Sequence, residues 1–151
     1  VDSGLEAGAT MIGVIIVTHG DLGKQLLKTS EDIVGAQENV VNIPLLPEEG
    51  IDDLRTKVSQ ALKELDSGEG VIILTDMIGG TPTNTSLSVA HSEKVEVITG
   101  VNLPILLELF SYRQIMPLEA LSDKVCQSGQ RSVINAKQIL LKKLADQNQP
   151  R

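Results

Sequence analysis

The stretch VIIVTHGDLG, residues Val14–Gly23, carries the strongest fold signal in the chain. Its apolar start belongs to a longer run, MIGVIIV, at Met11–Val17. This run has no polar alternation, which is typical of a strand buried on both faces of a parallel sheet. His19 follows the strand directly, and Asp21 stands where a helix is expected to begin. The stretch therefore predicts a strand–helix unit with a histidine at the end of a buried strand.

The rest of the chain continues this alternation of strands and helices. Three more apolar runs predict strands at residues 39–45, 70–76 and 94–100. Apolar residues recurring three or four apart predict helices at residues 21–34, 48–68, 81–92, 101–113 and 116–129. We therefore predict an α/β fold, with a parallel sheet and helices on both of its faces.

Two details of this pattern are less regular. Thr81 is expected as the N-cap of its helix, with Pro82 at the first helical position. After the last of these helices, residues 131–136 (RSVINA) can form a short strand, and residues 137–146 predict a basic amphipathic helix.

The amino-acid composition excludes several classes of protein. The chain has 151 residues, which suits one domain, and it is 41% hydrophobic but only 1% aromatic, so the core must be aliphatic. The formal charge of −7 argues against a nucleic-acid binder, which needs a basic surface. No apolar run approaches the roughly 20 residues of a membrane span, and nothing reads as a signal peptide. We therefore expect a cytoplasmic protein.

The ends of the chain and its cysteine give further expectations. Residues 1–10 have no hydrophobic period, and we expect an added remnant or a disordered lead before Met11. We place a single domain at residues 11–146 and a disordered tail at residues 147–151. The single cysteine, Cys126, excludes an intramolecular disulfide. It falls on the apolar side of a predicted helix, where we expect a buried structural thiol.

His19 and Asp76 occupy equivalent ends of the first and third predicted strands. Ligands of α/β sheets bind beyond the carboxyl ends of the strands, where the strand order reverses. If the two strands are neighbours, the Asp76 carboxylate can accept a hydrogen bond from one imidazole nitrogen. That bond would fix the tautomer and direct the lone pair of the other nitrogen outward. The pair thus predicts a nucleophilic histidine.

The segment GGTP, which follows Asp76, suits a phosphoryl group. Gly79 and Gly80 let backbone N–H groups approach an anion, and Gly20 does the same beside His19. Thr81 can donate its hydroxyl, and the start of the helix favours negative charge. We therefore predict phosphoryl transfer through a phosphohistidine, in which positioning and charge stabilisation supply most of the catalysis.

Structural explanations compete with this interpretation. A histidine after a strand is often a surface residue, and the glycines can serve only the bend. Asp21 is most simply an N-cap, and its charge is unfavourable beside a phosphate. His91 lies near a helix end, where it is expected to be solvated or to complement the helix dipole. The sequence has no P-loop, no G-x-G-x-x-G and no histidine–cysteine cluster for zinc, so no cofactor or metal is expected.

Three motifs together resemble a known family: THG after the first strand, TDMIGGTPTN after the third and GVNLP after the fourth. The chain is similar, from Met11 to about Ala136, to the enzyme IIA domain of the mannose-family phosphotransferase system. The resemblance implies a four-stranded parallel sheet in the order 2-1-3-4. It also implies that His19 takes phosphate from the carrier HPr and passes it to an enzyme IIB component on a separate chain. Asp76 matches the aspartate that hydrogen-bonds this histidine, and Thr81 matches a residue near the phosphoryl group.

The resemblance further implies a homodimer with an exchanged C-terminal strand, here near residues 131–136, and no metal requirement. The chain departs from the pattern at Ile78, where relatives often have an aromatic residue, and at Asp21, where a bulky apolar residue is common. Both departures are at positions that affect docking.

Other functions remain open at this point. The same site suits a regulatory module switched by phosphorylation of His19. It also suits the phosphotransfer subunit of dihydroxyacetone kinase, which has a similar first domain. A receiver-like domain phosphorylated on Asp76 is a further alternative, but receivers need an acidic cluster after the first strand, where this chain reads VTHG.

Overall fold

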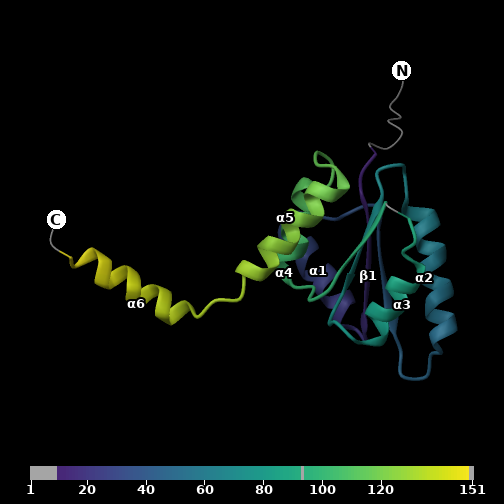
Figure 1. Ribbon diagram of the computed structural model, residues 1–151, viewed down its shortest axis with the longest axis horizontal. Coiled ribbons are helices and arrows are strands. Elements are labelled where there is room, and N and C mark those ends of the chain that lie inside the picture. Colours follow the sequence, from purple (N-terminus) through teal and green to yellow (C-terminus); the bar gives the residue numbers. More distant parts are fainter. Residues whose placement is uncertain (1–9, 93, 150–151) are drawn as a thin grey trace, which may run out of the picture.

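The computed structural model describes residues 10–92 and 94–149, and its elements follow the predicted alternation (Figure 1). The strands of this part are β1 (Gly13–His19), β2 (Val40–Leu45), β3 (Val71–Thr75) and β4 (Val95–Ile98). The helices are α1 (Leu22–Val34), α2 (Ile51–Leu65), α3 (Thr81–Val89), α4 (Leu103–Tyr112), α5 (Leu118–Arg131) and α6 (Ala136–Gln147). Of the lead expected at residues 1–10, residues 1–9 lie outside the described residues.

The four strands form one parallel sheet in the order β2-β1-β3-β4, which confirms the predicted fold class. His19 is aligned with Leu45 on β2, and Val17 with Thr75 on β3. From β1 the chain moves to one side of the sheet to form β2, and then to the other side to form β3 and β4. The order therefore reverses at β1 and β3, and the carboxyl ends of these two strands meet at the switch point.

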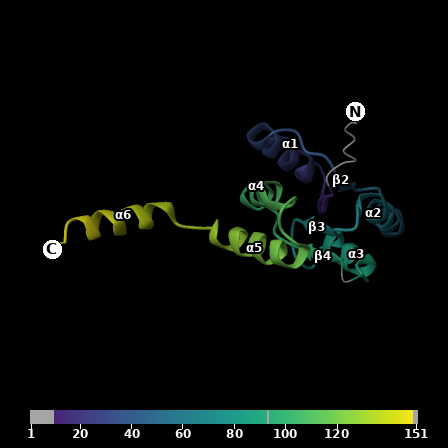
Figure 2. The same cartoon turned by 90° about the horizontal axis from the view of Figure 1, so that it is seen from above.

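Two helical layers cover the sheet. Helices α1, α4 and α5 lie on one face, and α2 and α3 lie on the other (Figure 2). Alternate residues of β1 supply the two cores: Val14 and Ile16 face the first layer, and Ile15 and Val17 face the second. All four are fully buried, which is why the strand sequence shows no polar alternation.

At the amino end of β1, the buried side chain of Arg113 ties three segments together. Its Nη1 donates to the carbonyls of Ile12 (3.4 Å) and Asn39 (3.1 Å), and its Nη2 donates to the carbonyl of Glu38. Burial lowers the pKa of Arg113 to about 10, so the guanidinium stays charged at neutral pH. Arg113 thus closes this end of the sheet.

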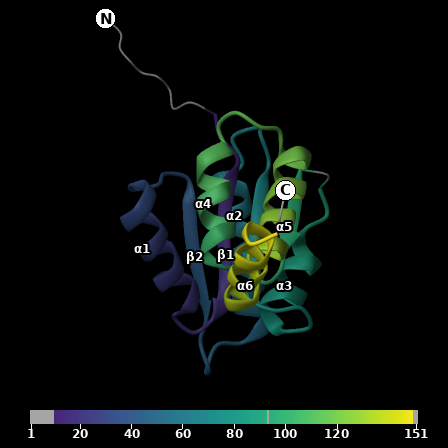
Figure 3. The same cartoon turned by 90° about the vertical axis from the view of Figure 1, so that its left-hand side faces the viewer.

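Helix α6 points away from the domain along the long axis of the molecule (Figures 1 and 3). None of its residues is buried. The helix includes Gln147, the first residue of the stretch that was expected to be a disordered tail. Residues 132–135 join α5 to α6 and form no strand. The short strand considered for residues 131–136 is therefore absent from the described part of this single chain.

Two predictions about individual residues are wrong. Cys126 is exposed, because the buried face of α5 is formed by Leu121, Val125 and Gly129, and Cys126 is turned about 100° from Val125. The N-cap of α3 is Gly80, and Thr81 is already helical. A helix needs no N–H bonds in its first turn, so Pro82 fits the second position as well as the first.

None of the described helices is both long enough and apolar enough to cross a membrane.

Candidate functional site

His19 and Asp76 meet at the carboxyl edge of the sheet, as their positions in the sequence predict. The Nδ1 of His19 lies 2.7 Å from Oδ2 of Asp76. The same oxygen accepts the backbone N–H of His19 at 2.9 Å. One carboxylate oxygen therefore holds both the backbone and the ring of the histidine.

The carboxylate of Asp76 is itself held in place. Its second oxygen, Oδ1, accepts the backbone N–H of Met77 at 3.0 Å, and its side chain is only 10% exposed. Burial acts to raise the pKa of Asp76, but the hydrogen bonds and charge of His19 outweigh it, so that pKa lies below its ordinary value. Asp76 is therefore a carboxylate at neutral pH and accepts a proton-bearing Nδ1.

This contact leaves the other ring nitrogen of His19 free to react. With its proton on Nδ1, the imidazole carries its lone pair on Nε2. The His19 side chain is 51% exposed, so a partner has access to the ring. A histidine with an ionised carboxylate on one nitrogen and solvent access to the ring has the geometry of a nucleophile.

The backbone around His19 is fixed by residues on either side of it. Thr18 is fully buried, and its hydroxyl accepts the N–H of Gly23 at 2.8 Å, which joins the end of β1 to the first turn of α1. Gly20 has a φ of +51° and donates its N–H to the carbonyl of Leu45 at 3.0 Å. Asp21 occupies the N-cap position of α1 as predicted, although its side chain makes no capping hydrogen bond.

The loop after Asp76 folds back against the histidine ring. A Cβ added at Gly80 would lie 3.2 Å from Cε1 of His19, so this close approach requires glycine or a shift of the ring. Gly79 has a φ of +81°, which glycine adopts without strain. Thr81 begins α3 and is half-buried, and no hydrogen bond of the described residues joins it to His19. The structure thus brings Gly80 to the ring and places Thr81 one residue further along the chain, at the start of α3.

Exposed apolar side chains lie on the segments that end at this edge of the sheet. Leu22 starts α1, Leu46 follows β2, and Met77 and Ile78 follow Asp76. These four side chains are between 46% and 79% exposed, and Ile78 is the most exposed of them. Apolar groups near an accessible histidine suit contact with a macromolecule rather than with a small polar substrate alone.

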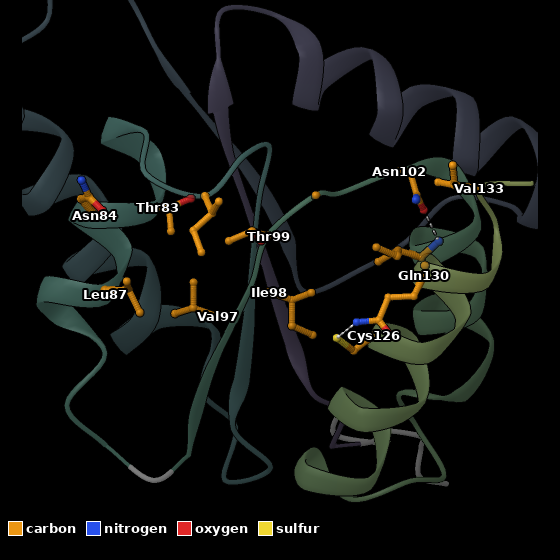
Figure 4. Close-up of a pocket in the computed structure, with 14 residues that line it drawn as sticks. Thr83, Asn84, Leu87, Val97, Ile98, Thr99, Asn102, Cys126, Gln130 and Val133 are labelled. Atoms are coloured by element: carbon orange, nitrogen blue, oxygen red, sulfur yellow. Dashed lines mark hydrogen bonds between the residues drawn. The ribbon is translucent and has the colours of Figure 1, made fainter.

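A groove runs along β4, one of the two edge strands of the described sheet, between α3 and α5 (Figure 4). It has a volume of about 590 Å³, and none of its lining residues is charged. Leu87, Ile98 and Val133 contribute apolar surface, and Thr83 lies at its α3 side. Within the described part of the chain, no three His, Cys, Asp or Glu side chains are placed to ligate a metal ion.

One feature of the site was not predicted from the sequence: a pair of buried threonines lies beneath the loop. Thr75 and Thr83 are 0% and 1% exposed, and their hydroxyls lie 2.6 Å apart. Thr75 follows a run of apolar residues and looks like an ordinary strand residue. Thr83 has no feature in the sequence that distinguishes it from other helix residues. The spacing of eight residues carried no signal for a contact.

Comparison with known proteins shows the family of the chain. A family model described as "PTS system fructose IIA component", of the EIIA-man group, matches residues 13–126. The PTS system fructose-specific EIIA component of Bacillus subtilis (strain 168) is 39% identical over 123 residues, which are 81% of this chain and 84% of that protein. The mannose-specific EIIAB component of Escherichia coli (strain K12) is 43% identical over 107 residues, 70% of this chain but only 33% of that longer protein.

Solved structures give the same result. The EIIA phosphotransferase component from Streptococcus agalactiae superposes with a TM-score of 0.78 at 30% identity, over 85% of this chain and 99% of that one. The PTS IIA protein associated with the fucose utilization operon of Streptococcus pneumoniae also has a TM-score of 0.78, at 34% identity, over 88% and 99% of the two chains.

Fold, site and matches together define a phosphotransferase-type α/β domain. The chain belongs to the mannose family of EIIA components, whose general role is phosphoryl transfer in the sugar phosphotransferase system.

Proposed function

We propose that His19 is the phosphoryl carrier of this protein, accepting phosphate from HPr and passing it to an enzyme IIB component on a separate chain. The observation that carries this proposal is the 2.7 Å contact between Nδ1 of His19 and Asp76, on a ring that is 51% exposed. We place this transfer in the cytoplasm, as expected for a cascade fed by phosphoenolpyruvate.

The proposed transfer needs no proton to leave the site. The lone pair on Nε2 of His19 forms the new N–P bond while the N–P bond of the donor histidine breaks, and its electron pair returns to the donor imidazole. His19 then carries the phosphoryl group on Nε2 and a proton on Nδ1, so its ring is cationic. The ionised Asp76 stabilises this charge, and the same steps in reverse deliver the group to IIB.

We assign the phosphoryl oxygens to the backbone N–H groups at Gly79 and Gly80 and to the Thr81 hydroxyl. The N–H of Gly20, which the sequence also suggested, already donates to the carbonyl of Leu45. Support comes from the close approach of Gly80 to the ring and from the start of α3 beside it. Free N–H groups at the start of a helix favour an anion. These residues would act by positioning and charge stabilisation rather than by bond making.

The test is intact mass after incubation with phosphoenolpyruvate, enzyme I and HPr. The wild-type chain should gain one phosphoryl group, about 80 mass units. His19→Ala should gain none while keeping its fold, because an exposed strand-end side chain contributes little to the core. His91→Ala is the matched control, since His91 is the other histidine of the chain and is also exposed. Phosphate on His19→Ala would refute the assignment.

A second step separates transport from regulation. Phosphorylated protein mixed with a IIB component of the mannose family should lose its phosphate to that component. A stable phosphoprotein that transfers to no IIB component would instead favour a regulatory module switched by the charge on His19.

We also propose that the protein works as a homodimer in which residues 131–136 pair with β4 of the partner subunit. Among the described strands, β4 has β3 as its single neighbour, so its outer edge is open. Val133 and Ile134 are 84% and 59% exposed in a segment beside this edge, and α6 has no buried residue. Light scattering should give twice the chain mass, and Ile134→Asp should give the monomer mass. A monomeric wild type at micromolar concentration would refute this.

A further inference from the structure

A short chain of buried hydroxyl groups lies beneath the loop that carries Asp76. The Thr75 and Thr83 hydroxyl oxygens lie 2.6 Å apart, and the Thr83 hydroxyl lies 2.6 Å from the carbonyl oxygen of Met77. Thr75 ends β3, Thr83 is in the first turn of α3, and both are essentially inaccessible to solvent. The chain thus links a strand, a helix and the loop between them.

The direction of these hydrogen bonds follows from the number of protons. A carbonyl only accepts, so Thr83 must donate its single hydroxyl proton to Met77. Thr83 can then only accept from Thr75, which donates. A side chain that lacks a hydroxyl at position 83 would break both bonds and leave the buried Thr75 hydroxyl without this partner.

These bonds fix the residue that follows Asp76. The N–H of Met77 donates to Oδ1 of Asp76 at 3.0 Å, and the carbonyl of Met77 accepts from Thr83. With both of its backbone polar groups bonded, Met77 has little conformational freedom. Asp76 is therefore anchored on its amino side by Thr75, at the end of the sheet, and on its carboxyl side by Met77.

We infer that Thr83 is a positioning residue for the His19–Asp76 pair, acting through Met77 and Thr75 to hold the carboxylate against the histidine ring. The expected effect of Thr83 on the transfer rate rests on the proposed function. Its expected effect on the tautomer of the His19 ring does not. Without the Thr83 hydroxyl, the loop would sample other conformations, and Asp76 would hold Nδ1 for less of the time. The fraction of His19 with its lone pair on Nε2 would fall.

The experiment compares Thr83→Val with two matched controls. Thr83→Val keeps the branched shape and removes the hydroxyl, whereas Thr83→Ser keeps the hydroxyl. Thr85→Val makes the same change at another buried threonine of α3, whose side chain has no hydrogen bond to the loop within the described residues. The readouts are the ¹⁵N shifts of the His19 ring, which report the tautomer, and the kcat and KM of phosphoryl transfer from HPr.

We expect Thr83→Val to lose the preference for the Nδ1–H tautomer and to lower kcat by roughly tenfold to a hundredfold, the cost typical of a misplaced catalytic group. The KM for HPr should not change, because Thr83 is buried and does not contribute to the docking surface. Thr83→Ser and Thr85→Val should keep wild-type shifts and kcat. Wild-type ring shifts in a folded Thr83→Val would overturn the inference.

If Thr83→Val does not fold, a second variant, Thr75→Val, tests the same inference. Thr75→Val leaves the Thr83–Met77 bond and removes the other half of the chain, so it should shift the tautomer in the same direction by a smaller amount; unchanged ring shifts there would also overturn the inference. Failure of the proposed function looks different. In that case, the wild-type chain takes up no phosphate, while the ring shifts still distinguish Thr83→Val from its controls.

Discussion

A side chain with several nitrogen atoms lies at each end of β1, and the two side chains differ in burial and in hydrogen bonding. At the amino end, both terminal nitrogens of Arg113 donate to two oxygens each, and the side chain is 3% exposed. At the carboxyl end, one nitrogen of His19 is bonded to Asp76 and the ring is 51% exposed. A buried side chain whose terminal nitrogens are all hydrogen-bonded stabilises the fold, whereas an exposed ring with one unbonded nitrogen can react.

The largest effect on rate, short of removing His19, is expected from Asp76→Asn. The amide cannot stabilise a cationic ring, and its NH₂ group can reverse the tautomer by donating to Nδ1. We expect kcat for transfer from HPr to fall by roughly a hundredfold to a thousandfold, with the fold intact. Rapid-quench measurement of phosphohistidine formation checks this. An unchanged rate would mean that the contact at the end of β1 has no part in the transfer.

At the other end of β1, Arg113→Met should lower the stability of the fold and leave the transfer rate of the folded protein unchanged. The change removes the donor to the carbonyls of Ile12 and Glu38 in a largely buried region, whereas the carbonyl of Asn39 keeps its bond from the N–H of Val14. We expect a loss of about 3 kcal/mol in the free energy of unfolding. Urea denaturation measures it. Arg55→Met is the control: Arg55 is 47% exposed and pairs with Asp52 on the surface, so its loss should stay within about 0.5 kcal/mol.

Gly80→Ala tests the packing around His19 at the carboxyl end of β1. The new methyl group would meet Cε1 of His19 at 3.2 Å and Cγ of Met77 at 3.4 Å, so the ring or the loop must shift by a few tenths of an ångström. We expect transfer to slow by roughly threefold to tenfold. Gly50→Ala is the control, because Gly50 is also a helix N-cap with an extended backbone, and a methyl there meets only Asp53, at 3.7 Å. Equal rates for the two variants would contradict the tight packing against His19.

The smallest expected effect is on the pH dependence of stability. The pKa of Asp76 is lowered in the folded chain, since the hydrogen bonds of His19 outweigh burial. A lowered pKa means that the carboxylate stabilises the fold above its ordinary pKa of 3.8 and that this contribution is lost as pH falls through the lower, folded-state value. The stability difference between wild type and Asp76→Asn should therefore shrink in acid. Denaturation curves from pH 7 downward would show it, and a difference that grew on acidification would contradict the sign.

Much of this molecule follows from sequence, because its strands are buried on both faces and its helices have clear apolar stripes. Strand positions in the sequence predict that His19 and Asp76 meet if the first and third strands are neighbours, and the family resemblance supplied the strand order that makes them so. The exposure of Cys126 was missed because the apolar pattern of α5 leaves its rotation uncertain by one residue. The contact between Thr75 and Thr83 depends on side-chain directions, which neither periodicity nor spacing reports. The strand proposed for residues 131–136 involves a second copy of the chain, and the segment 132–135 forms no strand in the single chain.

Asp76 accepts hydrogen bonds from both the backbone N–H and the ring of His19, and this arrangement has a consequence for the chemical identity of the phosphoprotein. Phosphohistidine exists as two regioisomers, which differ in which ring nitrogen carries phosphorus. With Nδ1 bonded to Asp76, only the tele isomer can form unless that contact breaks. The proposed carrier would thus be chemically homogeneous, and every phosphate it holds would leave from the same nitrogen and in the same direction.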